Sequence, residues 1–365
     1  MTVYTWLVVL LVVAAVFFHG NRRGSIKFIV TAFLILFVVM GLRDVNAFGR
    51  DASGSNGSYP IIYRRIGTTA WGELVDRDEK NYNIAFSYLM KVVYGQTDGN
   101  YQAFVTIISL FVIFSYMKFI KKYSSSPIQS VLCFLGLLYY TFMFDALKQA
   151  IAMAILLFAF DAIVDKKPVR FVLIVAIATA FHFPALIFLP AYWIGRMRTG
   201  RGYLALLALL LMTTYIFRDQ ILNLMLDAYG NADVEATMEG IRFLRNKVVI
   251  MIAIVCFAVL VRPPSPDDVL YNALLMFAGV AIMLQTFCGY NNIFERLADY
   301  YFHTSIILIP LIFEKTGKSK MRAIVGVDQF FIQAIPYLIC VFAVWRFLST
   351  VNNSAIYMPY RFIWQ

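Results

Sequence analysis

The sequence predicts an all-α, polytopic integral membrane protein with about 12 transmembrane helices, a large outer loop and interfacial helices. Three observations support this fold class: 61% of the 365 residues are apolar and only 15% are charged, and the mean hydropathy is +0.72. Soluble proteins contain about 45–50% apolar and ~25% charged residues. Because one span needs about 20 apolar residues, the chain has room for a dozen spans. We expect a single membrane domain over residues 1–365.

The predicted spans follow from apolar runs along the chain. The runs cover residues 4–18, 26–42, 101–119, 127–143, 146–164, 168–181, 183–196, 202–217, 246–261, 269–288, 298–313 and 329–348. The runs 168–181 and 183–196 are too short to cross the bilayer separately without thinning or a bend. They meet at His182, Phe183 and Pro184, where the proline disfavours helix at the residue before it. We therefore expect a short helical hairpin or a broken helix there.

The charges of the connections predict the orientation. With the connections after odd-numbered spans placed in the cytoplasm, these connections contain 17 basic and six acidic residues, whereas the rest of the chain contains 15 of each. This positive-inside pattern predicts that both termini lie outside. The first run is followed, not preceded, by basic residues, which is the reverse of a signal peptide and indicates a retained helix. The net charge of +11 is thus an orientation signal, and no nucleic acid is expected as a partner.

Two longer connections lie on the outer side. Residues 43–100 form a large outer loop, whose end at 82–95 has Ile84, Tyr88 and Val92 at helical spacing. This spacing predicts a helix lying in the membrane interface. Residues 218–245 form a second outer loop with a similar apolar pattern.

Ionisable residues gather at the predicted outer ends of the spans. Each is a candidate functional residue, because charge beside a membrane span is costly. They include Arg43, Asp44, Asp145, Lys148, His182, Arg218, Arg242, Arg245, Lys247, Glu295, Arg296, Asp299 and His303. Arg296, Tyr300 and His303 follow the spacing i, i+4, i+7 and so share a helix face. That set suits a phosphate or a sugar; the alternative is an interfacial girdle of aromatic and snorkelling side chains.

Motifs for other chemistries are absent from the sequence. It contains no GxGxxG, GxxxxGK[ST], HExxH or GxSxG, which argues against a nucleotide-sugar enzyme or an ATP-driven pump. Asp76 and Asp78 form a DxD spacing that can hold a divalent cation, although charge runs in loops are usually solvated surface. We expect no cofactor and no metal.

Three stretches together form a recognisable pattern. The first stretch is Gly41-Leu42-Arg43-Asp44, followed by Gly49-Arg50-Asp51 and by Tyr59 or Tyr63. The second stretch is Leu147-Lys148-Gln149-Ala150, then Lys166-Lys167, then Ala180-Phe181-His182-Phe183-Pro184-Ala185-Leu186. The third stretch is Asn292 with Glu295-Arg296-Leu297-Ala298 and Tyr300-Tyr301-Phe302. In order and spacing they resemble the EpsG family of bacterial exopolysaccharide polymerases, which are related in function to Wzy-type polymerases. The chain departs from the family pattern at Lys148, where an arginine is usual. Lysine keeps the charge but lacks the bidentate geometry of arginine.

The resemblance implies a substrate and a place. The substrate would be an oligosaccharide on undecaprenyl diphosphate, at the outer leaflet of the bacterial cytoplasmic (inner) membrane. The growing glycan would move from its lipid diphosphate onto the next lipid-linked repeat unit. This reaction needs cations for the leaving diphosphate and a base for the acceptor hydroxyl.

The resemblance also implies roles for individual residues. The expected diphosphate cluster is Arg43, Arg50, Lys148, His182 and Arg296, with His182 also counted as catalytic. Asp51, Glu73 and Glu295 are alternative bases, and Tyr300 and His303 are expected to bind sugar. A cationic cluster facing anionic lipid headgroups is the alternative for the arginines. Expected partners are membrane lipids, a chain-length regulator and a flippase.

Other functions stay open at the level of sequence. A flippase or transporter of lipid-linked oligosaccharide predicts polar residues reaching the midplane and both openings. A C-type glycosyltransferase using a polyprenyl-phosphate sugar would use Asp76 and Asp78 as a metal site. A ligase that moves a finished glycan would need the same residue types as a polymerase.

Overall fold

The computed structural model describes most of the chain. The described residues are 1–18, 20, 22–46, 51–52, 58–74, 83–197, 200, 202–220, 246–261, 268–287, 293–314 and 329–365. Within these ranges the structure is helical, and its only extended pairing is an isolated antiparallel bridge between Arg43 and Phe362. The predicted all-α class is therefore confirmed for the described part of the chain.

The chain divides into two compact units, which we describe separately. The first unit comprises Met1–Ala162, Val169–Leu186 and Gln333–Gln365, and the second comprises Ile163–Pro168 and Ile187–Ile332. The single membrane domain expected over residues 1–365 stays a prediction.

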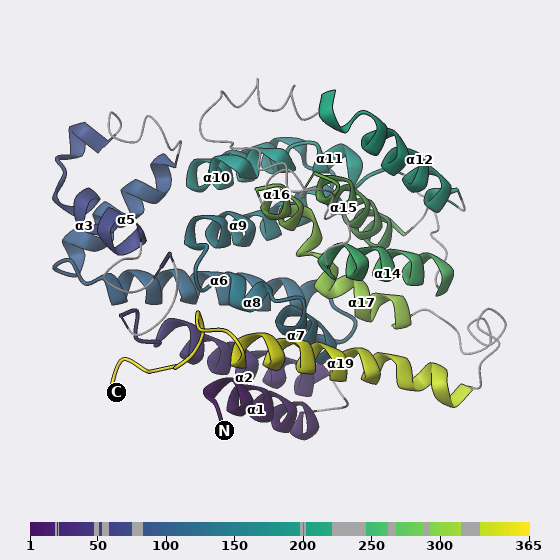
Figure 1. Cartoon of the computed structure of the whole chain (residues 1–365), viewed down its shortest axis with the longest axis horizontal. Coiled ribbons are helices and arrows are strands. Elements are labelled where there is room, and N and C mark those ends of the chain that lie inside the picture. The colour runs from purple at the N-terminus through teal and green to yellow at the C-terminus, as the bar shows by residue number, and fades with distance from the viewer. Residues whose placement is uncertain are drawn as a thin grey trace. The chain divides into compact units, whose positions relative to one another are not determined.

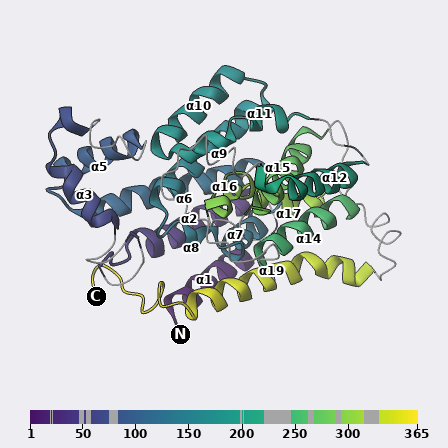
Figure 2. The same cartoon turned by 45° about the horizontal axis from the view of Figure 1, so that its top comes forward.

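In the first unit, α2 lies between α1 and α6, and α3 packs on α5. Both views show α3 and α5 side by side (Figures 1 and 2). The elements that lie wholly or mostly in the first unit are α1 (Val3–Phe17), α2 (Arg22–Gly41), α3 (Ser58–Thr68), η1 (Trp71–Glu73), α5 (Ile84–Gln96), α6 (Tyr101–Tyr123), α7 (Pro127–Gly136), α8 (Tyr139–Phe142), α9 (Leu147–Val164), α10 (Pro168–Phe181), η2 (Phe183–Phe188) and α19 (Gln329–Asn352).

In the second unit, α15 is the central helix and contacts α11, α12, α14, α16 and α17. The bounds are α11 (Ala191–Ile194), α12 (Tyr203–Ile216), α14 (Asn246–Val261), α15 (Val269–Gln285), α16 (Ile293–Phe302) and α17 (Ser305–Glu314). Most of the predicted second outer loop, from residue 221 to 245, lies outside the described residues.

Local sequence explains where several helices begin and end. The Asn100 side chain accepts a hydrogen bond from the backbone N–H of Ala103 at 3.1 Å and so caps α6, and Asp268 caps α15 in the same way. Such caps satisfy backbone donors that a helix start leaves unpaired. Pro127 opens α7, where its missing N–H is not needed.

The predicted number of about twelve spans is not confirmed. By length and composition, four helices of the described chain can cross a membrane: Arg23–Gly41, Tyr101–Tyr123, Leu147–Val164 and Ala334–Asn352. Shorter helices cover the other apolar runs. The run 127–143 is divided at Leu138, which has a left-handed φ of 65°, and the run 298–313 is divided between α16 and α17. The break predicted at His182–Pro184 is present, because α10 ends at Phe181 and η2 begins at Phe183.

Within the predicted interfacial segment, residues 82–95, the helix α5 begins at Ile84. Ile84, Tyr88 and Val92 are 39%, 38% and 48% exposed, and the exposed Trp71 stacks on Tyr88 with ring centroids 6.0 Å apart. An exposed apolar stripe fits a helix that lies in the interface, and this placement stays a prediction.

Candidate functional site

Arg43, just beyond the end of α2, is held in a fixed and fully buried position. Its Nη1 donates to the carbonyl oxygen of Met40 and its Nη2 to that of Phe144, both at 2.6 Å, and the guanidinium carbon lies 4.6 Å from the Phe144 ring centroid. Burial lowers the pKa of Arg43 from its usual value, and the nearby Asp145 carboxylate opposes that shift. The guanidinium stays charged and ties the end of α2 to the segment before α9.

Lys148 lies one turn beyond this anchor, in the first turn of α9. It is half-buried, and its Nζ lies 5.7 Å from the ring centroid of Phe86 in α5. The Tyr59 ring in α3 is also close to Phe86, with centroids 5.8 Å apart, and the Tyr59 hydroxyl lies 3.5 Å from the backbone nitrogen of Lys148. The starts of α3, α5 and α9 therefore meet around Phe86.

The turn that contains His182 reaches the same helix. The backbone N–H of Phe183 donates to Oδ1 of Asn83 at 3.4 Å, and Asn83 is the residue immediately before α5. His182 is half-buried. The structure thus brings the segments of Lys148 and His182 to the amino-terminal end of α5. We call this group, Tyr59, Asn83, Phe86, Lys148 and His182, the α5 cluster.

Of the three candidate bases, Asp51 is connected to the α5 cluster. Its carbonyl oxygen accepts a hydrogen bond from the backbone N–H of Tyr59 at 3.0 Å, and its side chain is half-buried. The next residue, Ala52, is fixed by a 2.9 Å hydrogen bond from the hydroxyl of Tyr101. Arg50 lies outside the described residues, and Glu73 is exposed in η1.

The second unit contains a separate ionic group at α16. Lys247 in α14 places Nζ 2.6 Å from Oδ1 of Asp299 and 3.4 Å from Oε1 of Glu295. The Asp299 side chain is 3% exposed and that of Glu295 is 30% exposed. We call Lys247, Glu295 and Asp299 the α16 triad; it fixes the start of α14 on α16.

The predicted shared face of Arg296, Tyr300 and His303 has an uneven environment. Arg296 is exposed, whereas Tyr300 and His303 are fully buried. The Nδ1 of His303 lies 2.8 Å from the carbonyl oxygen of Asp299. Arg296 is thus the member of this face that a bound molecule reaches from the surface.

Sequence reasoning identified the polar residues but missed their partners. Asn83 and Phe86 carry no motif, although they join the segments of Lys148 and His182, and the pairing of Lys247 with two carboxylates has no signal in a single sequence. Asp76 and Asp78, the DxD residues, and Asn292 lie outside the described residues.

The apolar helices and the polar groups at their ends define an all-α membrane protein. The EpsG family model matches residues 26–362. The chain therefore belongs to the EpsG family, and the predicted resemblance is confirmed. No curated protein and no solved structure matches the chain.

Proposed function

We propose that this protein is an exopolysaccharide polymerase that extends an undecaprenyl-diphosphate-linked glycan by one repeat unit at a time. Membership of the EpsG family suggests a polymerase of this general kind. The single observation that supports a reaction site is the α5 cluster, because it joins Lys148 and the His182 turn, which are 34 positions apart in the sequence.

The proposed reaction is a glycosyl transfer. A hydroxyl of the incoming lipid-linked unit attacks the anomeric carbon of the growing glycan, and a new glycosidic C–O bond forms. The bond between that carbon and the diphosphate breaks, and the diphosphate leaves with the electron pair. A carboxylate accepts the hydroxyl proton.

Cations are needed where the leaving diphosphate gains charge. Lys148 is the cation of the α5 cluster, and His182 contributes an imidazole; the diphosphate-binding role of Arg296, an exposed residue of α16, remains part of the proposal. Arg43 is fully buried on two carbonyls, so we assign it a positioning role, in which it holds the start of α9 and thereby Lys148. The sugar-binding roles of Tyr300 and His303 remain part of the proposal.

Asp51 is the base that we favour among Asp51, Glu73 and Glu295. Its backbone is tied to Tyr59, which contacts the amino end of α9, whereas Glu295 is engaged with Lys247. Asp51→Asn should therefore remove elongation, and Glu73→Gln should keep it. The opposite result would assign the base to Glu73.

The deciding experiment is reconstitution of the full chain in liposomes with one defined undecaprenyl-diphosphate-linked repeat unit, followed by sizing of the glycan. A ladder of multiples supports a polymerase. Intact substrate moved across the bilayer without a ladder would indicate a flippase, and a single transfer to another acceptor would indicate a ligase. Lys148→Gln should slow growth of the ladder at least tenfold, while Lys121→Gln, which removes the same charge from an exposed position on α6, should not.

A further inference from the structure

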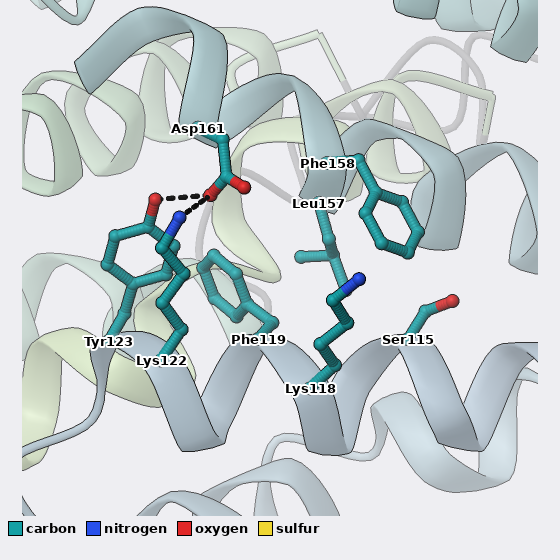
Figure 3. Close-up of a pocket in the computed structure, with 8 residues that line it drawn as sticks. All are labelled: Ser115, Lys118, Phe119, Lys122, Tyr123, Leu157, Phe158 and Asp161. Carbon is teal, nitrogen blue, oxygen red and sulfur yellow. Dashed lines mark hydrogen bonds and ion pairs between the residues drawn. The ribbon is translucent and has the colours of Figure 1, made fainter. Parts of the chain in front are cut away.

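An open hollow lies between the carboxyl-terminal halves of α6 and α9, and its lining residues all belong to the first unit. Ser115, Lys118 and Lys122 line it from α6, and Phe158 and Asp161 line it from α9 (Figure 3). None of these residues has a role in the proposed polymerase reaction. The predicted orientation places this end of both helices at the cytoplasmic surface.

The two lysines of the hollow differ in their partners. Lys122 places Nζ 2.8 Å from Oδ1 of Asp161, and the Tyr123 hydroxyl donates to the same oxygen; Figure 3 shows both side chains converging on that carboxylate. Lys118 Nζ lies 4.9 Å from the ring centroid of Phe158 and makes no ion pair within the described ranges. One ammonium is therefore neutralised and the other is held by an aromatic ring beside the hollow.

The surroundings add positive charge. Lys121, which immediately precedes Lys122 on α6, is exposed. Arg170 is close enough to act electrostatically on Asp161. Four positions after Asp161 in the sequence, Asp165 pairs with Lys167 at 3.4 Å. This excess of positive charge suits an anionic ligand.

An apolar stripe on α6 leads to Lys118. Ile107, Leu110, Phe111 and Phe114 are 43%, 45%, 37% and 51% exposed and follow the spacing i, i+3, i+4, i+7, so they share one helix face. A cation at the end of an exposed apolar stripe matches an amphiphile with an anionic head and a hydrocarbon tail. A free inorganic anion would make no use of the stripe.

We propose that this hollow binds the phosphate headgroup of an anionic phospholipid. Lys118 contacts the phosphate, Lys122 lies on the far side of the site, and the stripe that ends at Phe114 contacts an acyl chain. A bilayer with anionic lipids attracts basic residues at its surface, and the aromatic contact keeps the Lys118 ammonium in place. The site is independent of the proposed polymerase reaction.

The test measures lipid binding to the purified full-length protein in detergent, by native mass spectrometry. Phosphatidylglycerol is titrated against phosphatidylcholine, and a parallel titration adds millimolar inorganic phosphate. We expect a preference for phosphatidylglycerol that inorganic phosphate does not remove. Lys118→Gln should weaken binding of phosphatidylglycerol about fivefold, while Lys121→Gln, with the same charge change outside the hollow, should stay within about twofold.

Asp161→Asn gives a test of opposite sign. It removes the carboxylate that neutralises Lys122, so binding of phosphatidylglycerol should become tighter. The unfolding temperature of each variant is measured in parallel to confirm that it is folded.

Three outcomes would overturn the proposal. The first is an equal loss for Lys118→Gln and Lys121→Gln, which would show only an effect of net charge. The second is equal binding of phosphatidylcholine and phosphatidylglycerol. The third is release of the bound lipid by inorganic phosphate, which would assign the hollow to a free anion.

Discussion

Replacing Arg43 tests whether this buried guanidinium holds the first unit together. The change Arg43→Met removes two charge-assisted hydrogen bonds, to the carbonyl oxygens of Met40 and Phe144 at 2.6 Å, and the contact with the Phe144 ring. Each such hydrogen bond contributes about 1.5–3 kcal/mol, and the cation–π contact contributes about 0.5–2 kcal/mol. Arg43→Met also removes the desolvation cost of a buried charge, which offsets part of this loss of stability. We therefore expect a net destabilisation of about 4 kcal/mol.

Arg43→Lys separates charge from geometry. Lysine keeps the positive charge but presents one ammonium instead of a planar fork. It therefore reaches one carbonyl well and leaves the other without its donor. We expect a destabilisation of about 2 kcal/mol, roughly one charge-assisted hydrogen bond.

The assay is thermal unfolding of the purified protein in detergent, followed by circular dichroism. At about 2.1 cal/mol/K of unfolding entropy per residue, 4 kcal/mol lowers the midpoint by roughly 5 °C for a chain of this length. Arg361→Met is the matched control: its side chain is exposed, and it precedes Phe362, the residue that bridges to Arg43. We expect this control to stay within about 0.5 kcal/mol.

An unchanged midpoint for Arg43→Met would refute the anchoring role. Loss of glycan elongation in Arg43→Lys with an unchanged midpoint would instead show that Arg43 contacts the diphosphate directly. The assay therefore distinguishes positioning from substrate binding.

Three further predictions follow from the same contacts. Lys148→Gln should slow glycan elongation at least tenfold, as expected when one electrostatic stabiliser of a transition state is removed, without a shift in the unfolding midpoint. Asp299→Asn should destabilise the second unit by about 3 kcal/mol, because Lys247, with Nζ 2.6 Å away, loses its closer counter-charge; chemical unfolding measures this. Gly136→Ala should cost about 1–3 kcal/mol, because a Cβ on Gly136 would lie 2.5 Å from Cα of Ala343; thermal unfolding measures it.

Each of these predictions has a matched control in the chain. Lys121→Gln should elongate glycan normally. Glu295→Gln should cost less than Asp299→Asn, because Glu295 is 3.4 Å from Lys247 and 30% exposed. Gly72→Ala should be neutral, since no atom lies within 4 Å of the added Cβ. Equal effects of a variant and its control would contradict the corresponding contact.

The fold was predictable where local sequence sets it. Apolar runs predict α6 and α9, and a proline predicts the break after α10. The division between α7 and α8 was not predictable, because it occurs at Leu138 with φ of 65°, a conformation that leucine does not favour. Tertiary packing holds Leu138 in this left-handed conformation, and the periodicity of a single sequence does not reveal such packing.

The candidate site was predictable in its cations and not in its assembly. Charge placement at the ends of spans identified Lys148 and His182. Their meeting at α5 depends on Asn83, whose amide oxygen accepts a hydrogen bond from Phe183, 100 positions later. The full burial of Arg43 was also hidden, since an arginine at the end of a span is usually a snorkelling side chain.

The two kinds of cation in the first unit suit two different tasks. A guanidinium has several donors in one plane, and Arg43 uses them to hold two carbonyls that are 104 positions apart in the sequence. An ammonium is a compact charge on a flexible stem, and that of Lys148, a half-buried residue in the first turn of α9, lies 5.7 Å from the ring centroid of Phe86. The leaving diphosphate gains negative charge, and a cation held close to it stabilises the transition state whether that cation is an ammonium or a guanidinium. The lysine where the family usually has an arginine is therefore compatible with the proposed reaction, and Lys148→Arg is expected to retain elongation.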